Sequence, residues 1–358
     1  MKKLLLSAFA MFALGMSAQT EVSPYRPGLT TDGITYFLPN TSLHLTLTAK
    51  RITHVPGEFC KYAERYLRLK DVTMDKYDSW EITGMNIQPT GVANKEQAYT
   101  IKLNSKTAAP LVGLAPDGRL LTVNAQAPEL QKLSESKFGE PQSEKVEGSD
   151  YKTEEILLAG STAKMAELTA DEIFDIRDNR SLLAKGQADF MPKDGEQLRL
   201  MLASLDQQEK GLLQLFKGYD VVEEHVFVFD YTPEGEVNND LIFRFSKHLG
   251  VVDADDLAGA PVTITIKDLK SLPAAVEVEE KKKKEVQDLR YVTPGSASVK
   301  LFWDRKELAN AVIEMAQFGR IEHLGGELFD KKFTTKVYLS PTTGGLVKID
   351  LEQPEKKK

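Results

Sequence analysis

The sequence contains a single cysteine, Cys60, and only two tryptophans among its 358 residues. One cysteine excludes an intramolecular disulfide, so the stability of the monomer must come from packing. Positive charge is also scarce, since 46 Lys and Arg stand against 53 Asp and Glu, which gives a net charge of −7. An acidic chain of this kind argues against nucleic acid as a partner.

Long hydrophobic runs are missing except for Leu4 to Met16, which follows Lys2 and Lys3 and precedes the small residues Ser17 and Ala18. This arrangement is typical of a secretory signal peptide that is cleaved after Ala18. The run is too short for a stable transmembrane helix, and no cysteine follows it for lipid attachment. We therefore expect a protein exported to the periplasm or cell surface, not a lipoprotein, with no transmembrane segment in its mature form.

Cleavage would leave 340 residues with 44 basic and 53 acidic side chains, a net charge of −9. A single hydrophobic core rarely serves more than about 250 to 300 residues, so two domains, or one domain with an insertion, are expected. The composition, 41% hydrophobic and 28% charged, is that of a globular chain. The predicted units are a signal peptide (1–18), an N-terminal β-rich domain (19–124), a flexible loop or linker (125–155), a helical hairpin (156–218), a C-terminal β domain (219–352) and a charged tail (353–358).

The N-terminal domain begins with a clear strand, because Leu43, Leu45 and Leu47 alternate with polar residues. After Pro56-Gly57 the apolar period becomes helical and predicts a short helix over 59–67. Runs rich in β-forming residues, separated by Gly, Pro and Asn, predict three further strands. They are Trp80–Ile87, Tyr99–Leu103 and Leu120–Val123.

The central region has helical periodicity and helix-end signals. Thr169 and Glu172 fit a capping box, and that helix should end near Gly186. A second helix is predicted from Asp194 to a glycine cap at Gly218. Its apolar stripe should dock on a β region of this chain, or else on a second copy of it, because leaving it in water would be costly. The stripe contains Leu198, Met201, Leu202, Leu205, Leu212, Leu213 and Phe216.

The C-terminal domain returns to strand patterns on either side of the turn at Pro233, and again at Val262–Ile266. The run Glu277–Glu285 contains four consecutive lysines and reads as a charged surface loop. Residues 305–318 fit a helix or a β-hairpin, and we favour the hairpin. The predicted fold class is α+β: antiparallel β-rich N- and C-terminal regions, the latter a sandwich, flank a central helical hairpin.

Two distant segments, Val112 to Leu121 and Val337 to Leu346, show an internal sequence similarity. Each contains a strand, a proline turn, a glycine and a second strand in that order, which is the pattern of a β-hairpin. Similar turn chemistry can arise independently, so both duplication and convergence explain the match.

Two residue patterns allow nucleophilic chemistry but have simpler interpretations. Ser161 and Lys164 match the S-x-x-K pattern of penicillin-recognising enzymes, yet the S-D-N and K-T-G partners are missing, which favours a solvated helix start. Cys60 would need a histidine partner to act as a thiolate. Its position beside Phe59 on an apolar helical segment instead predicts a buried, inert side chain.

Metal and sugar sites are also weakly indicated. His44 and His54 could share one face of a long strand, but no further ligand pattern supports them. Asp253, Asp255 and Asp256 lack the spacing of an EF-hand loop and fit an acidic turn. Trp80 and Trp303 could stack on sugars but more often pack in strand-rich cores. The sequence therefore nominates no catalytic, cofactor-binding or metal residues.

Several segments together resemble an exported family of Bacteroidetes proteins, DUF4831. They are Tyr36-Phe-Leu-Pro-Asn40, the strand Leu43–Thr48 leading into Val55–Leu67, Ile176–Arg180 and Met191–Gly195. The resemblance covers essentially the whole chain and implies a location in the cell envelope of an anaerobic gut-type bacterium. The family has no assigned activity, so it implies no functional residues, no cofactor and no known partner.

From these observations we expect a non-enzymatic, exported envelope protein that binds another protein or a glycan, or has a structural role, with homo-oligomers left open. The alternative is an envelope hydrolase acting on glycans or peptides, with carboxylates from distant parts of the chain. A cleft with two carboxylates roughly 5 to 9 Å apart would favour the hydrolase. An apolar surface without perturbed titratable groups would favour the binding protein.

Overall fold

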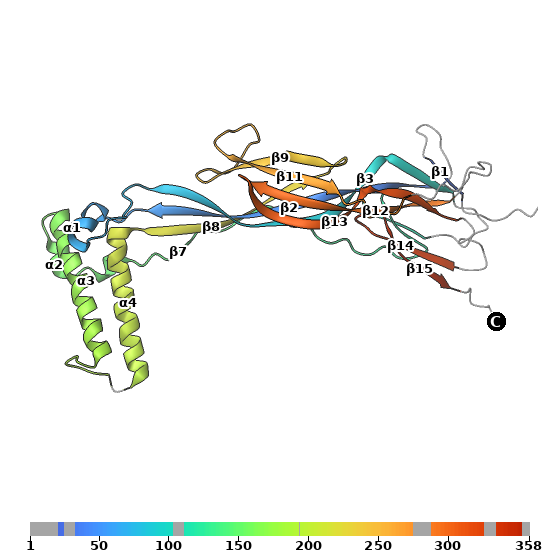
Figure 1. Cartoon of the computed structure of the whole chain (residues 1–358). Coiled ribbons are helices and arrows are strands. Elements are labelled where there is room, and N and C mark those ends of the chain that lie inside the picture. The colour runs from blue at the N-terminus through green and yellow to red at the C-terminus, as the bar shows by residue number, and fades with distance from the viewer. Residues whose placement is uncertain are drawn as a thin grey trace, which may run out of the picture.

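The computed structural model describes residues 21–24, 33–102, 111–192, 194–274, 288–325 and 334–352. The expected signal peptide, the charged run 277–285 and the tail 353–358 lie outside these ranges. The molecule is elongated, with a helical head at one end and β-sheets along the rest (Figure 1). The predicted α+β class, with antiparallel sheets and a central helical region, is confirmed.

The longest sheet forms the stem that carries the head. Its central strand, β2 (Ile34–Val55), pairs antiparallel with β3 (Tyr77–Lys102) on one side and with β8 (Tyr219–Tyr231) on the other. The predicted strand at 43–48 is thus part of a 22-residue strand. The predicted strand 80–87 and the described part of the predicted strand 99–103 both belong to β3. The smaller members of the sheet are β1 (Glu21–Pro24), β6 (Lys137–Phe138) and β7 (Gln142–Ser143).

A second sheet packs against the middle of the stem and makes a β-sandwich (Figure 1). Buried Leu43 and Leu45 of β2 face Ile264, Val299 and Met315 of this sheet. Burying such side chains contributes roughly 1.5 to 3 kcal/mol each, which explains why the alternating faces of the strands meet here. The order of the strands is β10 (Gly250–Val252), β9 (Val237–Ser246), β11 (Ala260–Asp268), β12 (Leu289–Trp303) and β13 (Lys306–Leu324).

Strands of both predicted β domains share sheets. β8 of the C-terminal region pairs with β2, and the third sheet joins two strands from each region. Its order is β15 (Leu346–Glu352), β14 (Thr334–Leu339), β5 (Leu120–Val123) and β4 (Val112–Leu114), and the two regions meet where β14 pairs with β5. Residues 305–318 lie mostly in β13, which pairs with β12, so the hairpin interpretation of this segment is confirmed.

The two segments with the internal sequence similarity form the hairpins β4–β5 and β14–β15, which lie side by side in the third sheet. Each has one extra residue on its second strand, Leu121 or Val347. The preceding long hairpins match as well: residues 94–97 of β3 bulge opposite Leu38, and residues 316–319 of β13 bulge opposite Pro294. The same irregularities in the same order indicate two copies of one structural unit, β2–β5 and β12–β15.

The helical head consists of α3 (Thr162–Lys185) and α4 (Gly195–Lys217) with shorter helices at their base. As predicted, Asp194 caps the start of α4 and Gly186 ends α3 in a left-handed conformation. The capping box at Thr169 is wrong. Ser161 caps α3 instead, and the Thr169 hydroxyl donates to the Met165 carbonyl inside the helix, a bond that a mid-helix threonine commonly makes.

The predicted docking of the hairpin on a β region is also wrong. Buried Leu212 and Phe216 of α4 pack on Ile173 of α3 and on Phe59, just before the short helices η1 (Cys60–Tyr62) and α1 (Ala63–Leu67). The two helices therefore cover their apolar stripe with each other and with this loop at the end of the stem. Their far ends project away from the sheets (Figure 1).

The predicted linker 125–155 runs along β8, and most of it is exposed. It is not without regular structure, because β6 and β7 pair with β8 and a 3-10 helix, η2 (Gly148–Tyr151), reaches the head. Exposed β8 backbone offers hydrogen-bond partners that an extended polar chain can satisfy. The flexibility of this segment stays a prediction. The remaining short helix is α2 (Glu154–Leu158).

Candidate functional site

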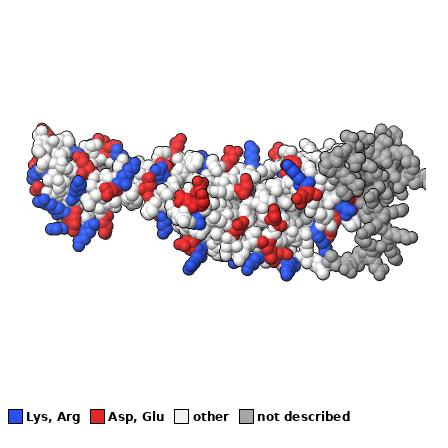
Figure 2. Space-filling model, turned by 90° about the horizontal axis from the view of Figure 1, so that it is seen from above, with Lys and Arg blue, Asp and Glu red and all other residues white. Residues whose placement is uncertain are grey.

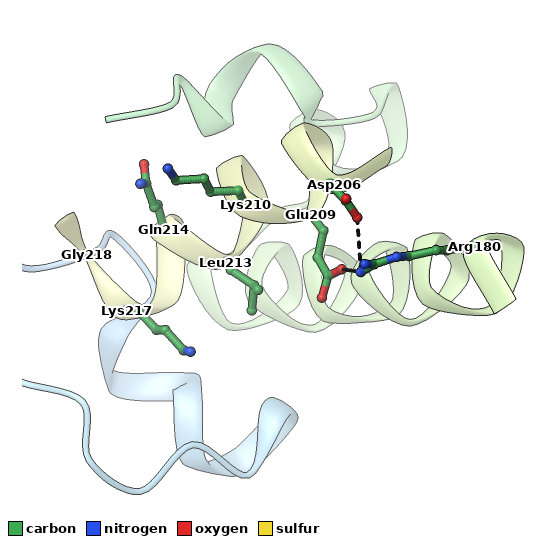
Figure 3. Close-up of a pocket in the computed structure, with 8 residues that line it drawn as sticks. All are labelled: Arg180, Asp206, Glu209, Lys210, Leu213, Gln214, Lys217 and Gly218. Carbon is green, nitrogen blue, oxygen red and sulfur yellow. Dashed lines mark ion pairs between the residues drawn. The ribbon is translucent and has the colours of Figure 1, made fainter. Parts of the chain in front are cut away.

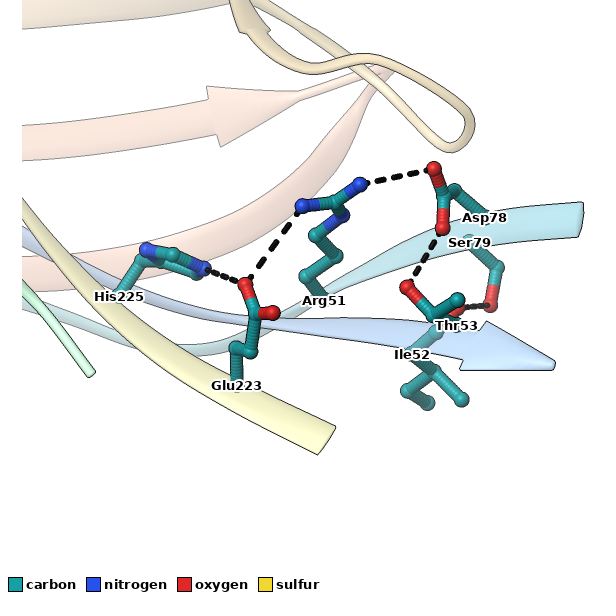
Figure 4. A network of polar contacts seen from close by, with 7 residues as sticks. All are labelled: Arg51, Ile52, Thr53, Asp78, Ser79, Glu223 and His225. Atoms are coloured by element: carbon teal, nitrogen blue, oxygen red, sulfur yellow. Dashed lines mark hydrogen bonds and ion pairs between the residues drawn. The ribbon is translucent and has the colours of Figure 1, made fainter. Parts of the chain in front are cut away.

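Between the sandwich and the head, β2, β3 and β8 continue as a narrow neck that carries a polar network (Figure 4). Arg51 of β2 lies at its centre. Its Nη2 lies 2.9 Å from Oδ2 of Asp78 on β3, and its Nη1 lies 3.6 Å from Oε2 of Glu223 on β8. One guanidinium therefore bridges the two outer strands across the middle one.

The carboxylate of Asp78 is held in its charged form. The Thr53 hydroxyl donates to Asp78 Oδ1 at 2.5 Å, and this bond together with Arg51 lowers the pKa of Asp78. The bond to Asp78 in turn raises the pKa of Arg51. Such a carboxylate is stabilised as an anion and is poorly suited to donate a proton as a general acid.

Replacing Asp78 by asparagine should change how stability depends on pH. Because the folded-state pKa is lowered, the contribution of Asp78 is present above its unfolded pKa of about 3.9 and is lost as pH falls through the folded value. Both partners are about one-third exposed, so we expect a loss below about 1 kcal/mol at pH 7 that shrinks as the pH falls below the unfolded pKa. Urea unfolding at pH 7, 5 and 3 measures it.

Glu81→Gln, which removes an exposed carboxylate from the same strand, is the matched control and should not show this pH dependence. An Asp78→Asn deficit that is equal at pH 7 and pH 3 would contradict the assignment.

His225 extends the network into an aromatic cluster. Its Nε2 lies 3.2 Å from Glu223 Oε2, and the rings of Trp80, Phe138 and Phe227 lie 5.0, 5.4 and 6.2 Å from its own. The side chain is 8% exposed, and its buried Nδ1 has no hydrogen-bond partner among the residues that the structure describes. His225 is therefore packed among the aromatic rings of the neck, and its contact with Glu223 holds that carboxylate in place.

The structure separates the two histidines considered as metal ligands. His44 and His54 both lie on β2, ten residues apart, a span of about 33 Å along a strand. Each pairs with the residue opposite it on β8, at 2.7 Å from Asp230 and from Asp220 respectively. They cannot bind one ion together. The described residues contain no group of three or more His, Cys, Asp or Glu side chains arranged to hold a metal ion.

A polar groove lies between α3 and α4 near the base of the head (Figure 3). Its two carboxylates, Asp206 and Glu209, both contact Arg180 Nη1, at 3.0 and 3.6 Å. Glu209 also lies 2.7 Å from Nε of Arg177. Because arginine stays charged at all ordinary pH values, both carboxylates are neutralised by permanent cations. A glycosidase needs a carboxylic acid that can protonate the leaving group, and both carboxylates here are instead engaged by arginine.

Farther along the hairpin lies an apolar groove with a volume of about 460 Å³. Leu183, Met201 and Leu205 form its walls together with Phe190 of the connecting loop. Phe190 is 63% exposed and Leu182 on α3 is 41% exposed, and both line the groove. Exposed apolar side chains in a groove are characteristic of a surface that receives another protein. The sequence predicted the stripe but not that the residues of its far half are only half-buried.

The nucleophile candidates take structural roles. Ser161 caps α3 by accepting a hydrogen bond from the Lys164 backbone N–H, and Lys164 Nζ lies 3.2 Å from Glu167, so this pair is the helix start that we favoured. The predicted burial of Cys60 is wrong: Phe59 takes the core position and Cys60 is half-buried at the first turn of η1. A 3-10 turn has three residues per turn, which moves the side chain away from the face that an α-helix would bury.

The remaining candidates follow their simpler interpretations. The aspartates after β10 form a hydrogen-bonded turn, in which the Asp256 N–H donates to Asp253 O and the Ala258 N–H donates to Asp256 Oδ1. Trp303 donates from Nε1 to the Phe245 carbonyl and packs edge-on against its ring at 5.4 Å. Trp80 lies in the aromatic cluster of the neck. Both tryptophans are thus engaged in packing.

Charge does not single out a binding face either. Acidic and basic side chains are interspersed along the face seen in Figure 2. None of the helices in the described part of the chain has the length and apolar character needed to cross a bilayer.

Together these features define an elongated α+β protein with a sandwich body, a neck held by cross-strand ion pairs and a projecting helical head. Residues 32–347 match the family described as a domain of unknown function, DUF4831, and the chain belongs to this family. The predicted family resemblance is confirmed. No curated protein and no solved structure matches the chain.

Proposed function

We propose that this protein is an exported, non-enzymatic component of the cell envelope that binds another protein through its helical head. The observation that carries the proposal is the apolar groove between the far ends of α3 and α4, which is lined by the exposed side chains of Phe190 and Leu182. The stem places this surface at one end of a long molecule (Figure 1). A head on a rigid stem suits a protein that reaches a partner at a distance from its body.

Two features support a protein partner over a glycan, and binding over hydrolysis. Sugar recognition commonly uses exposed aromatic rings, but Trp80 and Trp303 are occupied by contacts within the protein. The carboxyl groups with a shifted pKa, Asp78, Glu144, Glu196 and Glu322, are all shifted downward by cationic or hydroxyl partners. Hydrolysis by two carboxylates needs one that stays protonated near neutral pH.

Export is supported by the pattern of residues 1–18 and is tested by the mature N-terminus. Mass spectrometry of protein from the envelope fraction should find a chain that begins near Gln19. Intact Met1 in a cytosolic fraction would contradict export.

The role of the head is tested by crosslinking in intact envelopes. We expect the variant Phe190→Ser with Leu182→Ser to capture at least tenfold less of a specific crosslinked partner, because burying such side chains supplies roughly 1.5 to 3 kcal/mol each. Leu257→Ser removes a side chain that is 82% exposed on the loop between β10 and β11, and it is the matched control. The control should retain the partner.

Equal capture by the head variant and the control, with both folded by circular dichroism, would contradict the proposed role. Turnover of glycan or peptide substrates that survives the head substitutions would favour the hydrolase.

A further inference from the structure

The two copies of the repeated unit differ at their outer edges. In the first copy, β1 adds to the outer edge of β3 just beyond the four-residue bulge, with Val22 opposite Ile101 and Pro24 opposite Tyr99. In the second copy, β13 is the last strand of its sheet and pairs only with β12 among the described residues.

The register identifies the segment of β13 that corresponds to the paired segment of β3. Ala98 and Arg320 are the first residues to resume pairing after their bulges, opposite Phe37 and Thr293. Tyr99–Lys102 therefore corresponds to Ile321–Leu324. This segment pairs with Leu289–Val292 on one side only.

We propose that the outer edge of Ile321–Leu324 accepts the strand Glu21–Pro24 of a second copy of this chain. An edge strand presents a row of backbone N–H and C=O groups that an added strand can satisfy. The equivalent edge in the same molecule already takes this strand, so the required backbone geometry and register exist in the repeated unit. The exchange forms the same kind of bonds that it breaks, which keeps its cost low.

Two side chains of this edge segment are exposed, so an added strand would find one face of the sheet open beside it. Ile321 is 39% exposed, and the His323 side chain is 50% exposed. If the proposed cleavage after Ala18 occurs, Glu21–Pro24 lies within six residues of the new N-terminus. Short terminal strands are readily released and exchanged between copies. Because each copy offers one strand and one acceptor edge, the contact is heterologous and can extend beyond a dimer.

Cysteine pairs placed at the predicted register test the contact. The chain starting at Gln19, with Cys60→Ser, receives Val22→Cys together with His323→Cys, the residue that corresponds to Ile101. Oxidation should give covalent dimers and larger species. The matched control pairs Val22→Cys with Val312→Cys, which lies on the same strand and is 68% exposed but stands outside the predicted register. It should give at least fivefold less dimer.

Equal dimer yields from the two pairs would overturn the proposal, as would a Val22–His323 disulfide found only within single chains. Hydrogen exchange on the unmodified protein that begins at Gln19 gives an independent readout. The amides of 321–324 should exchange at least tenfold more slowly when the protein concentration is raised a hundredfold, and no change would overturn the proposal. Because both experiments use purified protein, their failure leaves the proposed role of the head untouched.

Discussion

Replacement of Gln317 by leucine should destabilise the body by about 3 to 5 kcal/mol, because buried backbone groups lose their partners. Gln317 lies in the bulge of β13. Its Oε1 accepts from the Thr41 N–H at 3.0 Å, and its Nε2 donates to the Thr41 and Pro233 carbonyls at 2.7 and 2.8 Å. The Thr41 residue is fully buried, so water cannot replace these bonds. Urea unfolding followed by tryptophan fluorescence measures the loss.

The control is Gln208→Leu, which removes a side-chain bond on the exposed surface of α4 and should change stability by less than about 0.5 kcal/mol. If Gln317→Leu lowers the free energy of unfolding as little as the control does, the side-chain amide of Gln317 does not hold β13 against β2. The bond matters because it joins the two layers of the sandwich where the bulge interrupts the regular pairing of the strands.

Replacement of Phe216 by alanine should destabilise the helical head by about 3 to 5 kcal/mol, the usual cost of removing a buried aromatic side chain. Phe216 is fully buried and its ring lies 5.5 Å from that of Phe59, which is also fully buried. The Phe59 N–H also donates to the Leu215 carbonyl at 2.7 Å. We expect the helical circular-dichroism signal of this variant to be lost at a lower urea concentration than that of the unmodified protein.

Leu200→Ala on the same helix is the matched control, since its side chain is 56% exposed and should cost less than about 0.5 kcal/mol. If the two variants unfold at the same urea concentration, the head is not anchored through Phe59 and Phe216. The two variants therefore test whether the half of the stripe near the stem anchors the head.

Local signals in the sequence predicted much of the secondary structure. The alternation of Leu43, Leu45 and Leu47 marked a strand correctly, because one face of that strand is buried in the sandwich. Asp194 and Gly186 marked helix ends correctly, because capping depends on the residue itself and on its immediate neighbours. Thr169 misled the prediction because a threonine hydroxyl can also bond within a helix, and Ser161 supplied an earlier cap.

The candidate surfaces were harder to predict because they depend on pairing between distant segments. Arg51, Asp78 and Glu223 form a network only through the register of β3, β2 and β8, which joins residues up to 172 positions apart. The apolar periodicity of α4 predicted the stripe, but periodicity alone does not show which other segments pack against the stripe. Leu212 is fully buried in the cluster around Phe59, whereas Leu198 of the same stripe lies outside this cluster and is only half-buried, because the covering segment reaches only the base of the hairpin.

The sequence by itself determined the periodicity of strands and helices, the helix caps at Asp194 and Gly186, the impossibility of an internal disulfide and the family. These properties follow from residue chemistry and from neighbours within a few positions. The tertiary structure decided that strands of both β regions share their sheets, that two copies of one unit differ at one edge, and that the head stands free. Strand register and burial depend on which distant segments meet, and the free energy of those contacts is a property of the assembled chain.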